Sequence, residues 1–346
     1  MGKYVVRRLL QAIPLLFILS LVFFALVFNT PGGPGAGIGR RGRGAVERQE
    51  RLERQYGLDQ PWYSQYVFWM VGNDWLKVDE DGDGTPETYG TRKGILRGDF
   101  GVSYRSRKPV LEEIGDRLPN TIYLVSVTLL VVAIVAIPIG IISAIKQYSA
   151  FDITATTLSF MGQAVPEFWL GLILILVFYS WLQNPFTGEP LFPAGGMATI
   201  GMDFDLVDRL KHLFLPVVMG MAGWVAWYSR FLRSSMLEVI HKDYIRTARA
   251  KGQIERKVLY KHALKNALIP LVTIFALDFP YMFAGSLYVE KIFSWPGMGR
   301  LFYDSATYRD YPVMLAIVII SSGIIIISNL LADIAYAWLD PRVRYD

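Results

Sequence analysis

Residues 121–145 read TIYLVSVTLLVVAIVAIPIGIISAI, a stretch that contains no charged side chain. A helix needs about 20 consecutive apolar residues to cross a hydrocarbon core about 30 Å thick. Backbone polar groups find no water in that core, so a segment that crosses it must satisfy them internally, as a helix does. The stretch therefore predicts a membrane-spanning helix.

Five further apolar runs of similar length occur in this chain of 346 residues, of which 53% are hydrophobic and 19% are charged. The charged fraction is below the ~25% of an ordinary soluble domain. The six runs are Leu9–Phe28, Thr121–Ile145, Ile153–Trp181, Leu213–Phe231, Ala267–Tyr288 and Val313–Trp338. We expect an all-α, polytopic membrane protein with six transmembrane helices.

The loop between the fourth and fifth runs predicts the orientation. Residues 230–265 read RFLRSSMLEVIHKDYIRTARAKGQIERKVLYKHALK, with ten Lys and Arg against three acidic residues. Short loops with such an excess stay in the cytoplasm. Basic residues precede the first run and no A-x-A cleavage site follows it, so we expect a retained helix with a cytoplasmic N-terminus. Six crossings return the C-terminus to the same side. The basic residues Arg342 and Arg344 near the C-terminus agree with a cytoplasmic location.

The spacing of the runs divides the chain into three parts. Residues 1–28 form an N-terminal transmembrane helix, and residues 29–118 form a large external segment between the first and second spans. Residues 119–346 form a five-helix core with a cytoplasmic loop at 236–265. The external segment includes an unusual acidic stretch at 79–90.

That acidic stretch reads DEDGDGTPETYG and has the pattern of a turn that wraps Ca²⁺. Hard carboxylate oxygens at alternate positions, followed by glycines that permit a tight backbone, are what calcium requires. The expected ligands are Asp79, Asp81 and Asp83, with Glu87 as a further one. Gly90 stands where a calcium loop has its bidentate Glu, so a solvated acidic loop is the alternative. Without an ion, the clustered carboxylates would repel one another.

Motifs of the common enzyme classes are absent. The chain has no cysteine and no H-E-x-x-H, G-x-S-x-G or G-x-x-x-x-G-K-[ST] sequence, which argues against a membrane-embedded enzyme and against an internal ATPase. Its net charge of +5 lies mostly on the inner loops, so no nucleic-acid partner is expected. A channel or ion-driven carrier is an alternative class, but ionisable relays within the spans are few.

Three polar residues within the apolar runs are candidates for a translocation path. Asp278 lies in the middle of the fifth run, and Gln163 and Glu167 lie one helical turn apart in the third. Burial of such groups in a membrane is costly and is usually tied to an aqueous path or to a contact between helices. Either role fits all three residues.

The centre of the basic loop, residues 243–252, reads DYIRTARAKG. It has the composition of a short helix, and the glycine at its end is a typical helix stop. A short helix on a cytoplasmic loop suits docking to a partner. We therefore expect the chain to receive energy from a separate subunit at this position.

Six ordered segments resemble one family. They are Tyr56–Pro61, Leu96–Tyr104, Asp243–Gly252, His262–Pro270, Glu290–Gly299 and Leu339–Arg342. With these segments, the chain resembles over nearly its whole length the permease subunits of binding-protein-dependent ABC importers, in the dipeptide, oligopeptide and nickel branch. The resemblance implies a type I ABC importer fold in a prokaryotic plasma membrane.

The resemblance also implies partners and a mechanism. The partners are a second homologous permease, two ATP-binding cassette ATPase subunits and an external substrate-binding protein, with a peptide as the cargo. Nickel or another small solute is the alternative cargo, because the external protein largely selects it. Alternating access would be driven by ATP hydrolysis on the partner subunits, and no cofactor would act in catalysis.

The loop helix is implied to be the coupling element between this chain and an ATPase. The residues expected to form it are Asp243, Tyr244, Arg246, Thr247, Ala248, Arg249, Ala250, Lys251 and Gly252. The superfamily pattern there is E-A-A-x-x-x-G, whereas this chain has Arg246, Thr247 and Ala248 in the first three places and Gly252 in the last. The missing Glu removes a salt bridge from that position and leaves the docking role intact.

Overall fold

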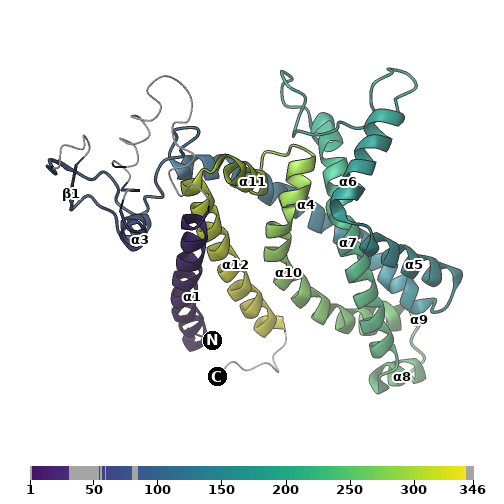
Figure 1. The fold of residues 1–346 in the computed structure, drawn as a ribbon. Coiled ribbons are helices and arrows are strands. Elements are labelled where there is room, and N and C mark those ends of the chain that lie inside the picture. The colour runs from purple at the N-terminus through teal and green to yellow at the C-terminus, as the bar shows by residue number, and fades with distance from the viewer. Residues whose placement is uncertain (1, 31–53, 55–56, 59, 80–84, 340–346) are drawn as a thin grey trace. The chain divides into compact units, whose positions relative to one another are not determined.

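The computed structural model describes residues 2–30, 54, 57–58, 60–79 and 85–339, and it is almost entirely helical (Figure 1). The described chain forms two compact units, which we call unit 1 (residues 119–300 and 327–339) and unit 2 (residues 2–118 and 301–326). Three helices contribute residues to both units: α4 (Val110–Ile145), α11 (Met298–Tyr308) and α12 (Tyr311–Leu339).

The remaining elements belong to one unit each. Unit 1 contains α5 (Ala150–Ala164), α6 (Glu167–Ile175), η2 (Leu176–Trp181), α7 (Leu206–Ile240), α8 (Asp243–Ala250), α9 (Glu255–Lys257), η3 (Val258–Leu264) and α10 (Lys265–Ile292). Unit 2 contains α1 (Gly2–Phe28), α3 (Trp62–Met70), β1 (Lys77–Val78), β2 (Thr88–Tyr89) and η1 (Ile95–Arg97).

The apolar runs predicted the long helices, and the structure supports up to five crossings among the described residues. By length and composition, α1, α4, α7 and α12 can each span a membrane, and the bent pair of α5 with α6 and η2 makes a fifth. The fifth predicted run lies within α10, a helix of 28 residues that is not among these. The membrane fold is confirmed at this level, and six spans stay a prediction.

The third predicted run is not one straight helix. Its two halves, Ala150–Ala164 and Glu167–Trp181, meet at an angle of 99°. Val165 has an extended backbone (φ −78°, ψ 125°), and the next helix starts after Pro166. A residue before proline is pushed out of the α region, and proline donates no backbone hydrogen bond, so the helix ends there. The single apolar run Ile153–Trp181 predicted by the sequence is therefore two helices in the structure.

The centre of unit 1 is α7, which packs against α5, α6 and α10 (Figure 1). Tyr228, Leu232 and Met236 of α7 are completely buried in the main apolar cluster of this unit. At Gly140 the backbone of α4 comes so close that an added Cβ would lie 2.8 Å from the Ser229 carbonyl oxygen. Small residues at such positions let membrane helices pack closely, which fixes α7 to its neighbours.

A completely buried carboxylate, Glu290, organises the chain after α10. It accepts hydrogen bonds from the Thr121 hydroxyl (2.7 Å) and the Arg300 backbone N–H (3.0 Å). The Thr121 oxygen in turn accepts from the Met298 N–H at 2.8 Å. Because a buried charge is tolerated only when its oxygens are paired, this set holds the 293–300 segment against the start of the α4 portion of unit 1.

Unit 2 is built around aromatic packing between α1, α3 and the start of α12. Phe24 of α1 packs on Tyr66 and Trp69 of α3, with ring centroids 5.3 and 5.6 Å away. The Thr30 hydroxyl, just after α1, lies 2.9 Å from the Tyr311 hydroxyl of α12. Buried aromatic side chains contribute large apolar area as well as specific ring geometry, so they join segments that are far apart in the sequence.

Asp310 ties the residues before α4 to the start of α12 within the same unit. Its carboxylate accepts hydrogen bonds from the Ser103 hydroxyl and the backbone N–H groups of Tyr104 and Arg105, and Asp310 itself is 3% exposed. The Arg105 guanidinium also lies 4.0 Å from the centre of the Tyr308 ring. Hydrogen bonds to a buried charged group contribute about 1.5–3 kcal/mol, so Asp310 is a major support of this junction.

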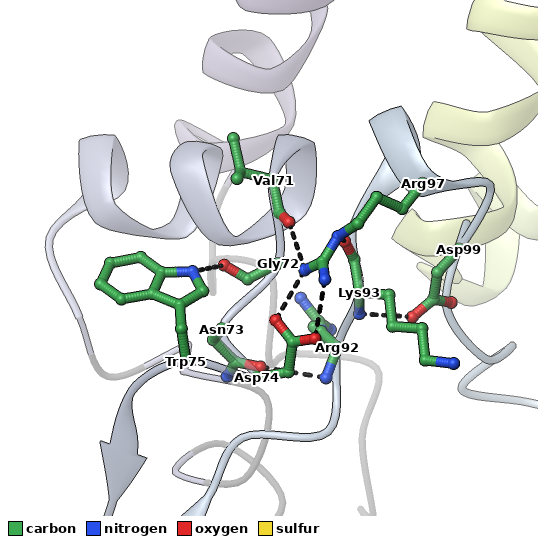
Figure 2. A network of polar contacts seen from close by, with 9 residues as sticks. All are labelled: Val71, Gly72, Asn73, Asp74, Trp75, Arg92, Lys93, Arg97 and Asp99. Atoms are coloured by element: carbon green, nitrogen blue, oxygen red, sulfur yellow. Dashed lines mark hydrogen bonds and ion pairs between the residues drawn. The ribbon is translucent and has the colours of Figure 1, made fainter.

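Figure 2 shows a polar network that closes the base of the 73–92 excursion. The Arg97 guanidinium donates to both carboxylate oxygens of Asp74 (2.6 and 2.8 Å) and to the carbonyl oxygens of Val71 and Lys93. Asn73 also bonds Arg92, through its backbone N–H and its side-chain oxygen. The hydrogen bonds from Arg97 lower the pKa of Asp74. The two ends of the excursion are therefore held side by side.

We predict that Gly297→Ala destabilises the protein. An added Cβ would lie 2.4 Å from the Glu290 carboxyl carbon, and overpacking of this kind costs about 1–3 kcal/mol. The measurement is the unfolding midpoint in detergent, followed by intrinsic Trp fluorescence. Gly115→Ala is the matched control, because nothing lies within 4 Å of its added Cβ and it sits inside a helix. Equal midpoints for the two variants would contradict the role of Glu290.

Candidate coupling helix and transport path

The helix α8 is anchored to unit 1 by two residues on one face. Ile245 is completely buried and Ala248 is 7% exposed, and both belong to the main apolar cluster around α7. Residues three apart lie on the same side of a helix, so this pair turns one face of α8 toward the bundle. α8 follows almost directly after α7, at one extremity of that helix (Figure 1).

The other faces of α8 are open. Its exposed residues are Asp243, Tyr244, Arg246, Thr247, Arg249 and Ala250, and Lys251 and Gly252 beyond them are exposed too. Tyr244 is an aromatic ring that is 45% exposed, and the nearby apolar Ile254 is 77% exposed. Of the nine residues predicted at this site, the structure places eight at the surface and uses Ala248 as part of the anchor.

The end of α8 depends on Gly252. Its φ of +72° is in the left-handed region, which glycine adopts readily and β-branched residues do not. The Gly252 N–H donates to the Arg249 carbonyl (2.9 Å), and the Lys251 N–H donates to that of Thr247 (3.0 Å). These bonds satisfy carbonyls that the helix end would otherwise leave without donors. The predicted helix and its glycine stop are confirmed.

An ion pair bridges the turn after α8. The Arg249 guanidinium donates to both carboxylate oxygens of Glu255, at 2.7 and 3.2 Å. This contact lowers the pKa of Glu255, so its stabilisation is complete above the ordinary pKa and is lost as the pH falls through the lowered one. The side chains are 40% and 55% exposed, and a surface pair contributes about 0–1 kcal/mol.

Asp278 bonds a neighbouring helix. Its carboxylate accepts a hydrogen bond from the Tyr228 hydroxyl of α7 at 2.9 Å. The completely buried Tyr228 ring stacks on Phe275, with the ring centroids 4.0 Å apart, and lies beside Trp224 at 5.8 Å. Asp278 therefore belongs to an aromatic contact between α7 and α10. Its role in a translocation path stays a prediction.

Gln163 and Glu167 lie on either side of the bend between α5 and α6, and both are exposed. The Gln163 side-chain oxygen accepts a hydrogen bond from Arg230 of α7 at 2.5 Å. The sequence placed Arg230 with the basic loop as a charge that sets topology. The structure instead directs it onto α5, a contact between residues 67 positions apart that no local pattern reveals.

A second contact between α5 and α7 was also missed. Arg233 donates to both carboxylate oxygens of Asp152, at 2.6 and 2.7 Å, and Asp152 is 2% exposed. The sequence does carry part of the signal, since Ser149 caps α5 and its hydroxyl accepts the Asp152 N–H. A cap followed by an acid three residues later marks a helix start, but this pattern does not predict that Arg233 is the partner of Asp152.

The predicted calcium loop lies mostly outside the described residues. Asp81 and Asp83 are not among them, whereas Asp79 and Glu87 directly follow and precede the antiparallel pair of Val78 and Thr88. Of the part of the chain that the structure describes, no group of three or more His, Cys, Asp or Glu residues is placed to hold a metal. Calcium binding stays a prediction.

Two family models match consecutive parts of the chain. The model described as "Binding-protein-dependent transport system inner membrane component" matches residues 136–345. The model described as "Binding-prot-dependent transport system membrane comp, N-term" matches residues 1–125. Together they account for nearly the whole sequence.

Curated relatives are similar over their full length. The oligopeptide transport system permease protein AppB of Bacillus subtilis (strain 168) is 41% identical over 349 residues, with 100% of each chain covered. The dipeptide transport system permease protein DppB of Escherichia coli (strain K12) is 36% identical, with 100% of this chain and 99% of DppB covered. The glutathione transport system permease protein GsiC of the same strain is also 36% identical, over 100% of both.

Solved structures share the fold at low sequence identity. A chain of the inward-facing MetNI methionine ABC transporter aligns with a TM-score of 0.52 and 14% identity. The alignment covers 67% of this chain and 98% of that one. The shared part supports a type I importer architecture for the helical bundle.

Proposed function

The chain belongs to the family of binding-protein-dependent transport system inner membrane components, and from this membership we propose that it imports peptides through a cell membrane. It is a permease subunit of an ABC importer and a multi-pass membrane protein. Its full-length relatives are named for oligopeptides, dipeptides and glutathione, all of which contain peptide-like amide bonds. The 41% identity over the entire oligopeptide permease is the observation that carries the proposal.

The proposed assembly contains a second homologous permease, two ATP-binding cassette ATPase subunits and an external binding protein that delivers the peptide. Six spans result if α10 crosses once and the bent pair of α5 and α6 crosses once. Both termini and α8 then lie in the cytoplasm, as the basic loop indicates, and the segment between α1 and α4 lies outside. ATP hydrolysis belongs to the partner subunits, because this chain has no phosphate-cradling motif.

The proposed path of energy runs through α8. Its buried Ile245 and Ala248 couple it to the cluster around α7, and its exposed Tyr244 and Arg246 are available to an ATPase. A contact that is equally strong in both states of a transporter shifts nothing. The exposed face must therefore bind the ATPase differently in the inward- and outward-facing states, while the anchor transmits the movement to the bundle.

The path for the peptide is proposed to pass Gln163, Glu167 and Asp278. The first two are exposed beside a break in a membrane helix, and Asp278 of α10 is half-buried and bonded to α7. Non-helical backbone at membrane depth is found where it is covered by protein or lines a water-filled cavity. Charged and amide groups near that break support a polar passage.

We predict that the complete complex, reconstituted in liposomes with its binding protein, accumulates labelled peptides from a mixed di- to pentapeptide library only when ATP is enclosed with the ATPases. Purification should also recover this chain together with two ATPase subunits and a second permease. Uptake of nickel without any peptide would favour the small-solute alternative. Transport by this chain alone, without ATPases, would contradict the importer assignment.

For the coupling helix, we predict that Gly252→Val reduces peptide uptake at least tenfold while insertion and expression stay normal. A β-branched residue in the left-handed region costs about 1–3 kcal/mol, and this strain unwinds the last turn of α8. Gly252→Asn is the matched control, since Asn tolerates that region, and it should retain most uptake. Deletion of residues 244–251 should abolish uptake, and normal uptake coupled to ATP hydrolysis in that deletion would refute the docking role.

For the acidic stretch, we propose a calcium site formed by Asp79, Asp81, Asp83 and Glu87 on the external side. Millimolar calcium, as found outside cells, would occupy even a weak loop of this kind. Calorimetric titration of the purified complex with calcium should give a binding heat that Asp81→Ala and Asp83→Ala remove. If the unmodified complex releases no more heat at millimolar calcium than the variant that carries both substitutions, the stretch is a solvated acidic loop.

A further inference from the structure

Arg230 lies on α7 at the cytoplasmic end of the fourth predicted run, where the basic loop begins. Its Nε donates to the Ala226 carbonyl at 3.1 Å, and one Nη donates to the Gln163 side-chain oxygen of α5. Its guanidinium carbon also lies 4.6 Å from the centre of the Phe160 ring. All three partners are neutral, and none of the described carboxylates forms an ion pair with it.

The direction of this side chain matters. Ala226 lies one helical turn before Arg230, on the side of α7 that is farther from α8. In the proposed topology, the guanidinium thus turns back toward the membrane interior, whereas an arginine near a helix end usually extends toward the interface. A charged side chain that turns into a membrane span usually faces a water-filled cavity or an ionic partner.

Arg233, one turn farther along α7, provides a direct contrast. The carboxylate of Asp152 neutralises it through two hydrogen bonds of 2.6 and 2.7 Å, and Asp152 is almost completely buried. The same two helices thus supply a carboxylate for one arginine and only an amide and a ring for the other. Arg230 therefore contacts α5 through neutral groups, and no described carboxylate neutralises its charge.

The surroundings of Arg230 are accessible. Phe160 is 58% exposed, and Gln163 is exposed next to the break before Pro166. A planar guanidinium that is supported by an aromatic face and oriented by an amide is prepared to bind a carboxylate in the bidentate manner that arginine favours. Every linear peptide with an unmodified end carries such a group at its C-terminus.

We propose that Arg230, positioned by Gln163 and Phe160, binds the C-terminal carboxylate of the peptide during its passage through the membrane. This inference rests on the proposed function and names the part of the cargo that the permease itself recognises. Arg230 contacts the substrate, and Gln163 is a positioning residue.

The test compares one imported peptide from the library with its C-terminal amide, in the wild-type complex and in Arg230→Gln. For each complex, the uptake of the free-carboxyl peptide is divided by the uptake of its amide. The binding protein is the same in both complexes, so its preference for one peptide cancels when the two quotients are compared. We expect uptake of the free-carboxyl peptide to fall about tenfold or more in the variant, since a charge-assisted pair is lost. Uptake of the amide should change less than about twofold, within the error of such cycles.

Arg233→Gln is the matched control, because it removes an identical side chain one turn away. It breaks the Asp152 pair and should reduce uptake of both peptides equally, with an unchanged ratio. Gln163→Ala should shift the ratio in the same direction as Arg230→Gln but by less. Where the binding protein rejects the amide, the four combinations are measured as equilibrium binding to the nucleotide-free complex in detergent.

Two results would overturn the proposal. An equal loss for both peptides in Arg230→Gln would indicate that Arg230 binds a lipid phosphate or a carboxylate of the second permease. Unchanged uptake of both peptides in Arg230→Gln would show that transport does not depend on any anion bound by Arg230. If the wild-type complex imports no peptide of the library, the proposed function fails as well, whereas peptide uptake with an unaltered ratio refutes only the carboxylate site.

Discussion

A hydrocarbon interior offers backbone amide groups no partner except one another, and this constraint governs every long helix of the chain. It explains why long apolar runs become α1, α4, α7 and α12. It also explains why the sharp break between α5 and α6 is informative. At Val165 and Pro166 a helix ends within a predicted span, and polar groups gather beside it, where Gln163 meets Arg230. The break at Pro166 is therefore where the proposed polar passage begins.

Within unit 1, α7 has two tasks that require different surfaces. Its buried face, with Tyr228, Leu232 and Met236, belongs to the apolar cluster that also anchors Ile245 of α8. Its other face presents Arg230 to α5. A displacement of α8 is therefore transmitted through tightly packed side chains, which do not deform continuously, to the helix that carries the candidate substrate contact. In the proposed mechanism, the coupling surface and the peptide path share one rigid element.

The sequence was sufficient for features that depend on neighbours in the chain. Apolar length predicted the long helices, and the position of Gly252 predicted the end of α8, because both reflect local backbone physics. The segment Leu96–Tyr104 contributed to the family resemblance, but the hydrogen bond from Ser103 to Asp310 crosses 207 positions and could not be predicted from it. Glu290, Asp152 and Arg230 show the same limit, since the partner of each lies on another helix. The bend at Pro166 differs from these, because the proline that causes it is visible in the sequence.

The closed base of the 73–92 excursion has a practical consequence. Arg97, Asp74 and Asn73 hold the two ends together through contacts that do not involve the residues between β1 and β2. Loop tips whose ends are already joined are the positions at which proteins best tolerate inserted sequence. An epitope or fluorescent label grafted between Val78 and Thr88 would leave every residue of unit 1 unchanged. A label at this position would report on which side of the membrane the segment lies, and transport could be measured on the same labelled protein.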